Sequence, residues 1–122
     1  MALFNNTLSI LMNQRITWLN ARGNVLVNNI AHADDRAATR RELKSFKEVI
    51  AQSPKKLKSA GNGLSEVRVL KITEDDVIKT KTEIAREIEM LEMSNNSLEH
   101  DSLINIVRNF HRMLKSVLGK GQ

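Results

Sequence analysis

Apolar side chains recur at steps of three and four residues near both ends of the chain, and the middle lacks such a repeat. The N-terminal row is Leu8, Met12, Ile16, Leu19, Gly23, Leu26, Ile30 and Ala33. The C-terminal rows are Ile84, Ile88, Leu91, Asn95 and Leu98, followed by Leu103, Ile106, Phe110, Met113 and Val117. Steps of three and four place side chains on one helix face, and a sustained period near 3.5 requires a partner helix. The pattern predicts two long terminal helices that pair with each other or with neighbouring copies.

The N-terminal repeat predicts one helix over residues 5–33. Asn5, Asn6 or Thr7 can cap it, because each places a side-chain acceptor near unpaired backbone N–H groups. Gly23 lies inside this helix, where glycine costs about 1 kcal/mol relative to alanine. We therefore expect another helix to approach closely at Gly23.

The C-terminal helix is predicted to start at Thr73, with Asp76 three residues later as in a capping box, and to end at Gly119. Its two apolar rows do not share a register, because Leu98 and Leu103 are five residues apart. Either the row shifts around a continuous helix, or the polar run at 94–97 kinks it. We favour the continuous helix.

The middle of the chain predicts shorter elements. After the Asp34-Asp35 pair, residues 36–52 have the spacing of a basic amphipathic helix, although a loosely ordered linker would have the same composition. Ser53-Pro54 ends this segment, and the Lys-, Ser- and Gly-rich residues 55–63 indicate a loop. Alternation over 66–72 is a weak strand signal, which would form one arm of a small hairpin.

Together these elements predict an all-α protein whose two terminal helices pack as an antiparallel, coiled-coil-like pair. The expected segments are an N-terminal assembly helix (1–35), a basic middle segment with a short helix or loop and a small β-hairpin (36–73), and a C-terminal assembly helix (74–122). The chain has 122 residues with three Phe, one Trp and no Tyr. This composition suits helix–helix seams better than a β-sandwich.

Charge is unevenly distributed along the chain. The net charge is +5. Residues 36–58 hold eight Lys or Arg against two Glu, whereas residues 74–92 hold seven acidic side chains against three basic ones. Such segments favour pairing with each other or between copies, although solvated helix faces are an equally simple explanation.

The sequence contains no pattern typical of a catalytic, metal or cofactor site. Cysteine is absent, and His32, His100 and His111 are widely separated without a ligand-like cluster. Gly61-Asn62-Gly63 lacks the Lys-Ser/Thr of a phosphate loop. We expect no enzymatic activity, no cofactor and no metal. No window of about 18 uncharged apolar residues indicates a membrane span, and Met1–Met12 lacks the features of a secretory signal.

Segments at both ends resemble the bacterial flagellar basal-body rod family, in particular its FlgB-type proximal-rod subunits. Residues 24–34 read NVLVNNIAHAD, which is similar to the family's N-terminal signature LANNIANADTPGY. Residues 83–90, 94–98 and 113–119 resemble its C-terminal DLEKEMAKL, AENSLRY and SMLKSAI patterns. The resemblance covers roughly half of the chain.

The chain departs from this family directly after the signature. Residues 35–38 read Asp-Arg-Ala-Ala where the family has Thr-Pro-Gly-Tyr, and His32 stands where the family has Asn. Without Pro or Gly the encoded turn is lost and helix propensity rises. We expect the segment past the signature to differ from a standard subunit.

The resemblance implies a structural role. Such subunits leave the cytosol through the flagellar type III export apparatus without a cleaved signal, and polymerise through their terminal helices into the proximal rod, the torque-transmitting shaft of the basal body in the periplasm. Implied partners are other copies of the chain, the adjoining rod proteins and the adaptor between rod and membrane ring, without nucleic acid. A monomeric, partly disordered chain that gains helix on polymerisation would follow.

The subunit interface expected from the resemblance and the repeats includes polar residues that can set register. It comprises Leu8, Met12, Ile16, Leu19, Leu26, Asn28, Asn29, Ile30, Ile84, Ile88, Leu91, Leu98, Ile106, Phe110, Met113 and Val117. Two alternatives stay open at this point. A coiled-coil adaptor or export chaperone would have the same two-ended repeat, and a basic helical protein could bind nucleic-acid phosphates through residues 36–58.

Overall fold

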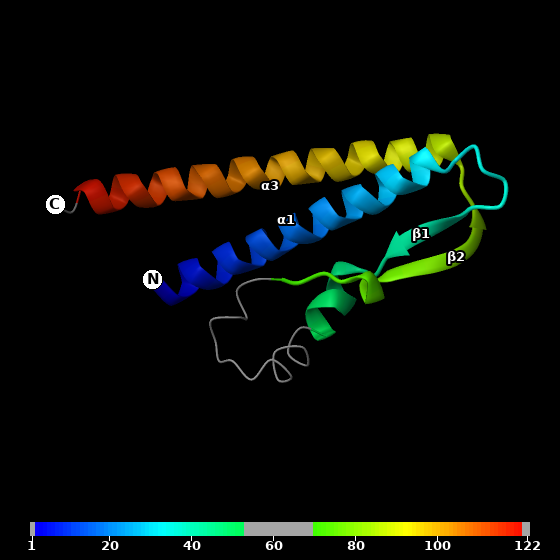
Figure 1. Ribbon diagram of the computed structural model, residues 1–122. Helices are drawn as coiled ribbons and strands as arrows, with labels where there is room; N and C mark the ends of the chain where they lie inside the picture. Colours follow the sequence, from blue (N-terminus) through cyan, green and yellow to red (C-terminus); the bar gives the residue numbers. More distant parts are fainter. Residues whose placement is uncertain (1, 53–69, 121–122) are drawn as a thin grey trace.

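The computed structural model describes residues 2–52 and 70–120 of the chain. In chain order its elements are helix α1 (Ala2–Ala31), strand β1 (Thr39–Leu43), a short helix whose described part covers 46–52, the 3₁₀ turn η2 (Glu74–Asp76), strand β2 (Val77–Glu83) and helix α3 (Arg86–Lys120). Helices α1 and α3 lie side by side and run in opposite directions, so the start of α1 and the end of α3 lie at the same end of the molecule (Figure 1). The hairpin of β1 and β2 extends along α1. The predicted fold class is therefore confirmed.

Both terminal helices are long. With 30 and 35 residues, α1 and α3 measure about 45 Å and 52 Å at 1.5 Å per residue. Helix α3 continues without interruption through 94–97, so the prediction of a continuous helix with a shifted apolar row is confirmed. Its C-terminal end extends past the start of α1 (Figure 1).

The prediction of a helix over residues 36–52 was wrong for its first half. Residues 39–43 form a strand, and only 46–52 are helical. Antiparallel pairing with β2 satisfies the backbone of this segment, and such tertiary pairing overrides a weak local helix propensity.

The predicted start of the C-terminal helix was also placed too early. The cap was correct, because the Asp76 side chain accepts the backbone N–H of Thr73 at 3.0 Å, but the helical backbone ends after the single turn Glu74–Asp76. The next seven residues form β2, since its Val, Ile and two Thr side chains favour an extended backbone. The hairpin arm predicted at 66–72 lies largely outside the described residues, and 70–72 belong to no strand.

The two strands form an antiparallel pair with one irregularity. Leu43 lies opposite Val77 and Arg41 opposite Lys79, and the register shifts between Arg41 and Thr39. Side chains alternate across a strand, so Leu43 and Arg41 belong to the same face of the hairpin.

The hydrophobic core is small and lies between α1, the hairpin and the short helix. Its buried members are Trp18, Leu19, Leu43, Val49 and Leu70. The indole N–H of Trp18 donates a hydrogen bond of 2.8 Å to the carbonyl oxygen of Lys44, which satisfies the polar atom of this large side chain. Because Trp18 and Leu19 come from the middle of α1, the core fixes the hairpin to that part of the helix.

Candidate assembly surface

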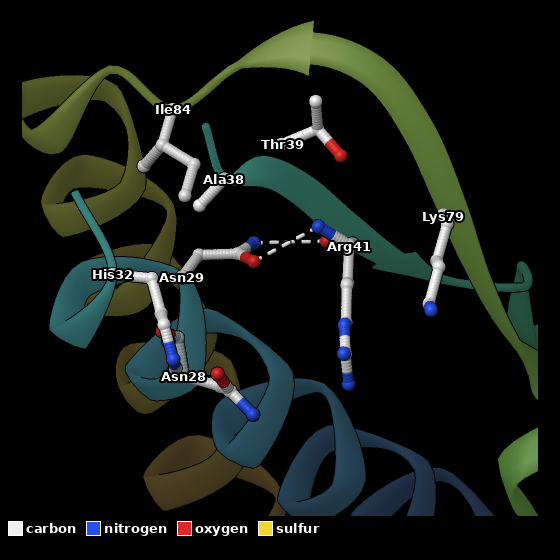
Figure 2. A pocket seen from close by; sticks show the side chains of 8 residues that line it. All are labelled: Asn28, Asn29, His32, Ala38, Thr39, Arg41, Lys79 and Ile84. Carbon is white, nitrogen blue, oxygen red and sulfur yellow. Dashed lines mark hydrogen bonds between the residues drawn. The ribbon is translucent and has the colours of Figure 1, made fainter. Parts of the chain in front are cut away.

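A buried asparagine joins three elements near the end of α1. The side-chain amide of Asn29 donates to the carbonyl oxygen of Arg41 at 2.8 Å, and its oxygen accepts the Arg41 backbone N–H at 2.9 Å. These two bonds continue the hydrogen-bond pattern of β1 onto an α1 side chain (Figure 2). The same amide also lies 3.2 Å from a carboxylate oxygen of Glu89 in α3. Asn29, which belongs to the signature-like segment, therefore holds α1, β1 and α3 together.

Glu89 is the acidic partner at this junction. Its side chain is 1% exposed and accepts a hydrogen bond of 2.8 Å from Nε of Arg40. This hydrogen bond raises the pKa of the Arg40 guanidinium, and Glu42 adds to the effect from 3.6 Å. A buried carboxylate needs such a cation together with further donors, and Arg40 and Asn29 supply both. The junction is thus a satisfied ion pair that fixes the hairpin to the start of α3.

Helix α3 meets the middle of α1 through a second asparagine. The Asn96 side chain donates to the carbonyl oxygen of Leu19 at 2.9 Å. A Cβ atom built at Gly23 would lie 3.3 Å from the Asn96 amide nitrogen and 3.7 Å from the terminal carbon of Met93. The predicted close approach at Gly23 is confirmed, because any side chain at this position would crowd the Asn96 amide.

Arginines of α1 extend the contact on one side. Arg15 forms a bidentate pair with Glu99 at 2.6 and 3.0 Å, and its guanidinium lies 4.5 Å from the Trp18 ring centre and 5.1 Å from that of Phe46. The hydrogen bond from Arg15 lowers the pKa of Glu99. Two turns further along α1, Arg22 donates to Glu92 and to the side-chain oxygen of Asn96. Such bonds depend on geometry and so set the register of the two helices.

Polar side chains therefore make the hydrogen bonds and ion pairs between α3 and α1, and many of the apolar side chains of α3 lie elsewhere on the helix. Six of the predicted interface residues are 52–67% exposed: Ile88, Leu91, Leu98, Ile106, Met113 and Val117. We call these six side chains the α3 row. At 100° per residue they follow one stripe roughly 115° around the helix from the stripe that contacts α1. Leu103 and Phe110, which the sequence placed in the same row, are half-buried, and Leu103 packs against the core.

The N-terminal row, unlike the α3 row, is mostly buried or half-buried within the chain. Leu19 and Leu26 are buried and Met12, Ile16 and Ile30 are half-buried, so this row is used within the chain. Leu8 is exposed at the far end of α1. The two rows predicted as a mutual seam therefore do not face each other, because polar pairs occupy the seam and leave the α3 row in solvent.

A small cavity borders the Asn29 junction. It measures about 170 Å³ and is lined by Asn28, Asn29, His32, Ala38, Thr39, Arg41, Lys79 and Ile84 (Figure 2). Arg41 and Lys79 lie directly opposite each other in the hairpin, and neither joins an ion pair within the described part of the chain. Asn28 is exposed here, and Ile84 is half-buried. The two asparagines that the sequence treated alike thus differ, because Asn29 is buried and Asn28 is not.

Several important residues had no clear signal in the sequence. In the sequence, Glu89 and Asn96 resemble any other polar residue of a long helix. Arg40 likewise is one of several cations in a basic segment. Their roles depend on partners 49 to 77 residues away in the chain.

Among residues 2–52 and 70–120, no cluster of His, Cys, Asp or Glu side chains has the arrangement of a metal site. Within the same residues, neither long helix is apolar enough over a sufficient length to cross a bilayer. Comparisons with protein-family models, curated proteins and solved structures found no match to this chain.

Proposed function

We propose that this chain is a structural subunit of the bacterial flagellar rod that polymerises through its terminal helices. Its partners would be other copies of itself and the adjoining rod proteins, and its location the basal body, which it would reach by export without a cleaved signal. The assignment to the rod is supported by the sequence signature at residues 24–34, and the polymerising role by the exposed surface of α3.

The observation that carries the proposal is the α3 row. Monomeric proteins commonly expose single apolar residues, but six along one helix stripe, with only Asn95, Ser102 and Asn109 between them, indicate an interaction surface. The row extends from Ile88 to Val117, a length of about 44 Å. A stripe of this length on one straight helix suits lengthwise packing against another helix better than binding of a small ligand.

The internal packing of the chain supports the same role. Polar pairs such as Arg15–Glu99 fix α1 to α3 without using the α3 row. Two long antiparallel helices held in register form a stiff element, as a torque-bearing shaft needs. Repetition of a contact between different faces of the subunit builds an open helical filament.

The signature-like segment also has a physical role that fits a subunit held in one shape. Asn29 connects the end of α1 to β1 and α3, so it fixes the angle at which the hairpin leaves the helix pair. In a polymer, every copy must present its surfaces at the same angle. A buried polar junction achieves this because its hydrogen bonds are satisfied in one geometry.

The test is a substitution within the α3 row that leaves the fold intact. Leu98 is 66% exposed, so Leu98→Asp should not unfold the monomer, yet it would bury a carboxylate in any contact made by the row. Ser97→Asp is the matched control, since it adds the same charge at the neighbouring exposed residue outside the row. Both variants should show the wild-type circular dichroism spectrum.

Polymerisation and rod assembly are then measured separately. At high protein concentration, purified wild-type chain and Ser97→Asp should form sedimenting polymers, and Leu98→Asp should not; the dimer described below is measured at concentrations under this threshold. In the bacterium that encodes the chain, Leu98→Asp should abolish motility, and a tagged wild-type chain should co-purify with basal bodies. Absence of the tagged chain from basal bodies would refute the rod assignment, and equal polymerisation by both variants would refute the assembly role of the α3 row.

A further inference from the structure

We propose that the α3 row also pairs two copies of this chain in an antiparallel, two-fold symmetric dimer centred on Ser102. The occupant of the exposed face is then a second copy of α3 that runs in the opposite direction. This pair uses the same side chains as the proposed polymer, but it does not depend on the chain being a rod protein.

The first argument is the spacing of the row, which is nearly symmetric about Ser102. Leu98 and Ile106 lie four residues on either side of it, and Leu91 and Met113 lie eleven. Ile88 and Val117 complete the row at fourteen and fifteen residues. An antiparallel copy centred at Ser102 therefore places an apolar side chain against each member of the row.

The polar positions of the same stripe obey the same symmetry. Asn95 and Asn109 lie seven residues on either side of Ser102, and both are exposed. In the antiparallel pair, Asn95 faces the partner's Asn109 and Ser102 faces its own copy. Amide side chains can pair with each other, and polar pairs within an apolar seam select one register.

The second argument is the charge of α3, which changes sign at the proposed centre. Residues 86–101 hold five carboxylates and one guanidinium, a net charge of −4. Residues 102–120 hold four cations and no carboxylate, a net charge of +4. Antiparallel overlap puts the acidic half of each copy against the basic half of the other, which favours association in this orientation. Parallel helices in full overlap would place like charges together.

One specific ion pair follows from this register. Glu87 and Arg112 are exposed, and neither joins an ion pair within the described part of the chain. At 100° per residue they lie within about 20° of each other, on one flank of the row. A two-fold axis brings like flanks together, and the partner's Arg112 then lies about 7.5 Å from Glu87 along the helix. An arginine side chain spans that distance, so the dimer contains two such pairs.

The face is accessible and large enough. Helix α1 packs on a stripe roughly 115° away, which leaves space for a neighbouring helix. An exposed Leu, Ile or Met side chain offers about 100 Å² of apolar surface. The six members in two copies therefore bury about 1,200 Å², the lower end of the range for stable interfaces.

The dimer would control when the chain assembles. A two-fold contact is closed, since each copy uses the row on its only partner and leaves no open end. Two copies paired in this way cannot extend a filament until they separate. The pair therefore keeps the α3 row out of solvent before assembly and competes with polymerisation.

A cysteine at the symmetry axis tests the geometry directly. The chain has no cysteine, so Ser102→Cys introduces a single thiol that faces its own copy. Closely packed helices bring such positions within the Cα separation of 4.4–6.8 Å that a disulfide requires. Ser97→Cys is the matched control, because this exposed position lies about 140° around the helix from Ser102. Under mild oxidation we expect a disulfide-linked dimer from Ser102→Cys and none from Ser97→Cys.

Charge reversal tests the register. Glu87→Arg and Arg112→Glu should each raise the dimer dissociation constant about tenfold, because each creates two like-charge contacts. The double variant restores both pairs and should return to within about threefold of wild type. Analytical ultracentrifugation measures all four proteins. Equal cross-linking at both cysteine positions, a monomeric wild type, or a double variant as weak as the single ones would overturn the dimer. None of these results would refute the rod assignment, which is tested by the motility and basal-body experiments.

Discussion

Replacing Asn29 with alanine should destabilise the protein far more than the same change at its neighbour. The variant loses three hydrogen bonds, two to the Arg41 backbone and one to Glu89. Asn29 is 2% exposed and Glu89 is 1% exposed, so water does not replace the lost partners easily. At roughly 1 kcal/mol for each bond, and somewhat more where a buried group is left unpaired, we expect a loss of about 2–4 kcal/mol. That is a large part of the 5–15 kcal/mol typical of a folded domain.

The control for this prediction is Asn28→Ala, which changes an exposed asparagine in the same helix turn and should cost about 0.5 kcal/mol or less. Urea unfolding of both variants can be followed by circular dichroism and by the fluorescence of Trp18, the chain's single tryptophan. Amide hydrogen exchange should show faster exchange at Arg41 in Asn29→Ala alone. Equal unfolding free energies for the two variants would refute the role assigned to Asn29.

Three further outcomes follow from the structure. Pairing with Arg15 depresses the pKa of Glu99 in the folded state. The stabilisation of the fold by this pair is therefore complete above the unfolded-state pKa of about 4.3, and it is lost as the pH falls through the folded-state pKa. The stability difference between wild type and Glu99→Gln, below about 1 kcal/mol because the pair is partly exposed, should shrink in acid urea titrations. Gly23→Leu should lower the unfolding free energy by more than 2 kcal/mol, because the new side chain displaces Asn96 from its hydrogen bond, and wild-type stability would contradict this. Leu26→Asp should lose helical signal in circular dichroism, since it buries a carboxylate; a folded variant would show that α1 is not held at this position.

The positions of the two long helices could be predicted from the sequence because helical periodicity is a local property. Steps of three and four residues identified α1 and α3, and the cap at Thr73 was found from two side chains three residues apart. A small hairpin was expected between the helices, but the positions of both its strands were missed. Its arms are 34 residues or more apart in the chain, and a strand forms only when its partner supplies hydrogen bonds.

Amphipathicity by itself determined that each terminal helix has an apolar stripe, but it could not tell which stripe would be buried. An apolar side chain gains from any contact that removes it from water, so its preference has no direction. The partners of Glu89, Asn96 and Arg15 were decided by tertiary structure, because a hydrogen bond forms at one distance and one angle. Those bonds turn Glu89, Asn96 and Glu99 of α3 toward α1 and leave the α3 row exposed.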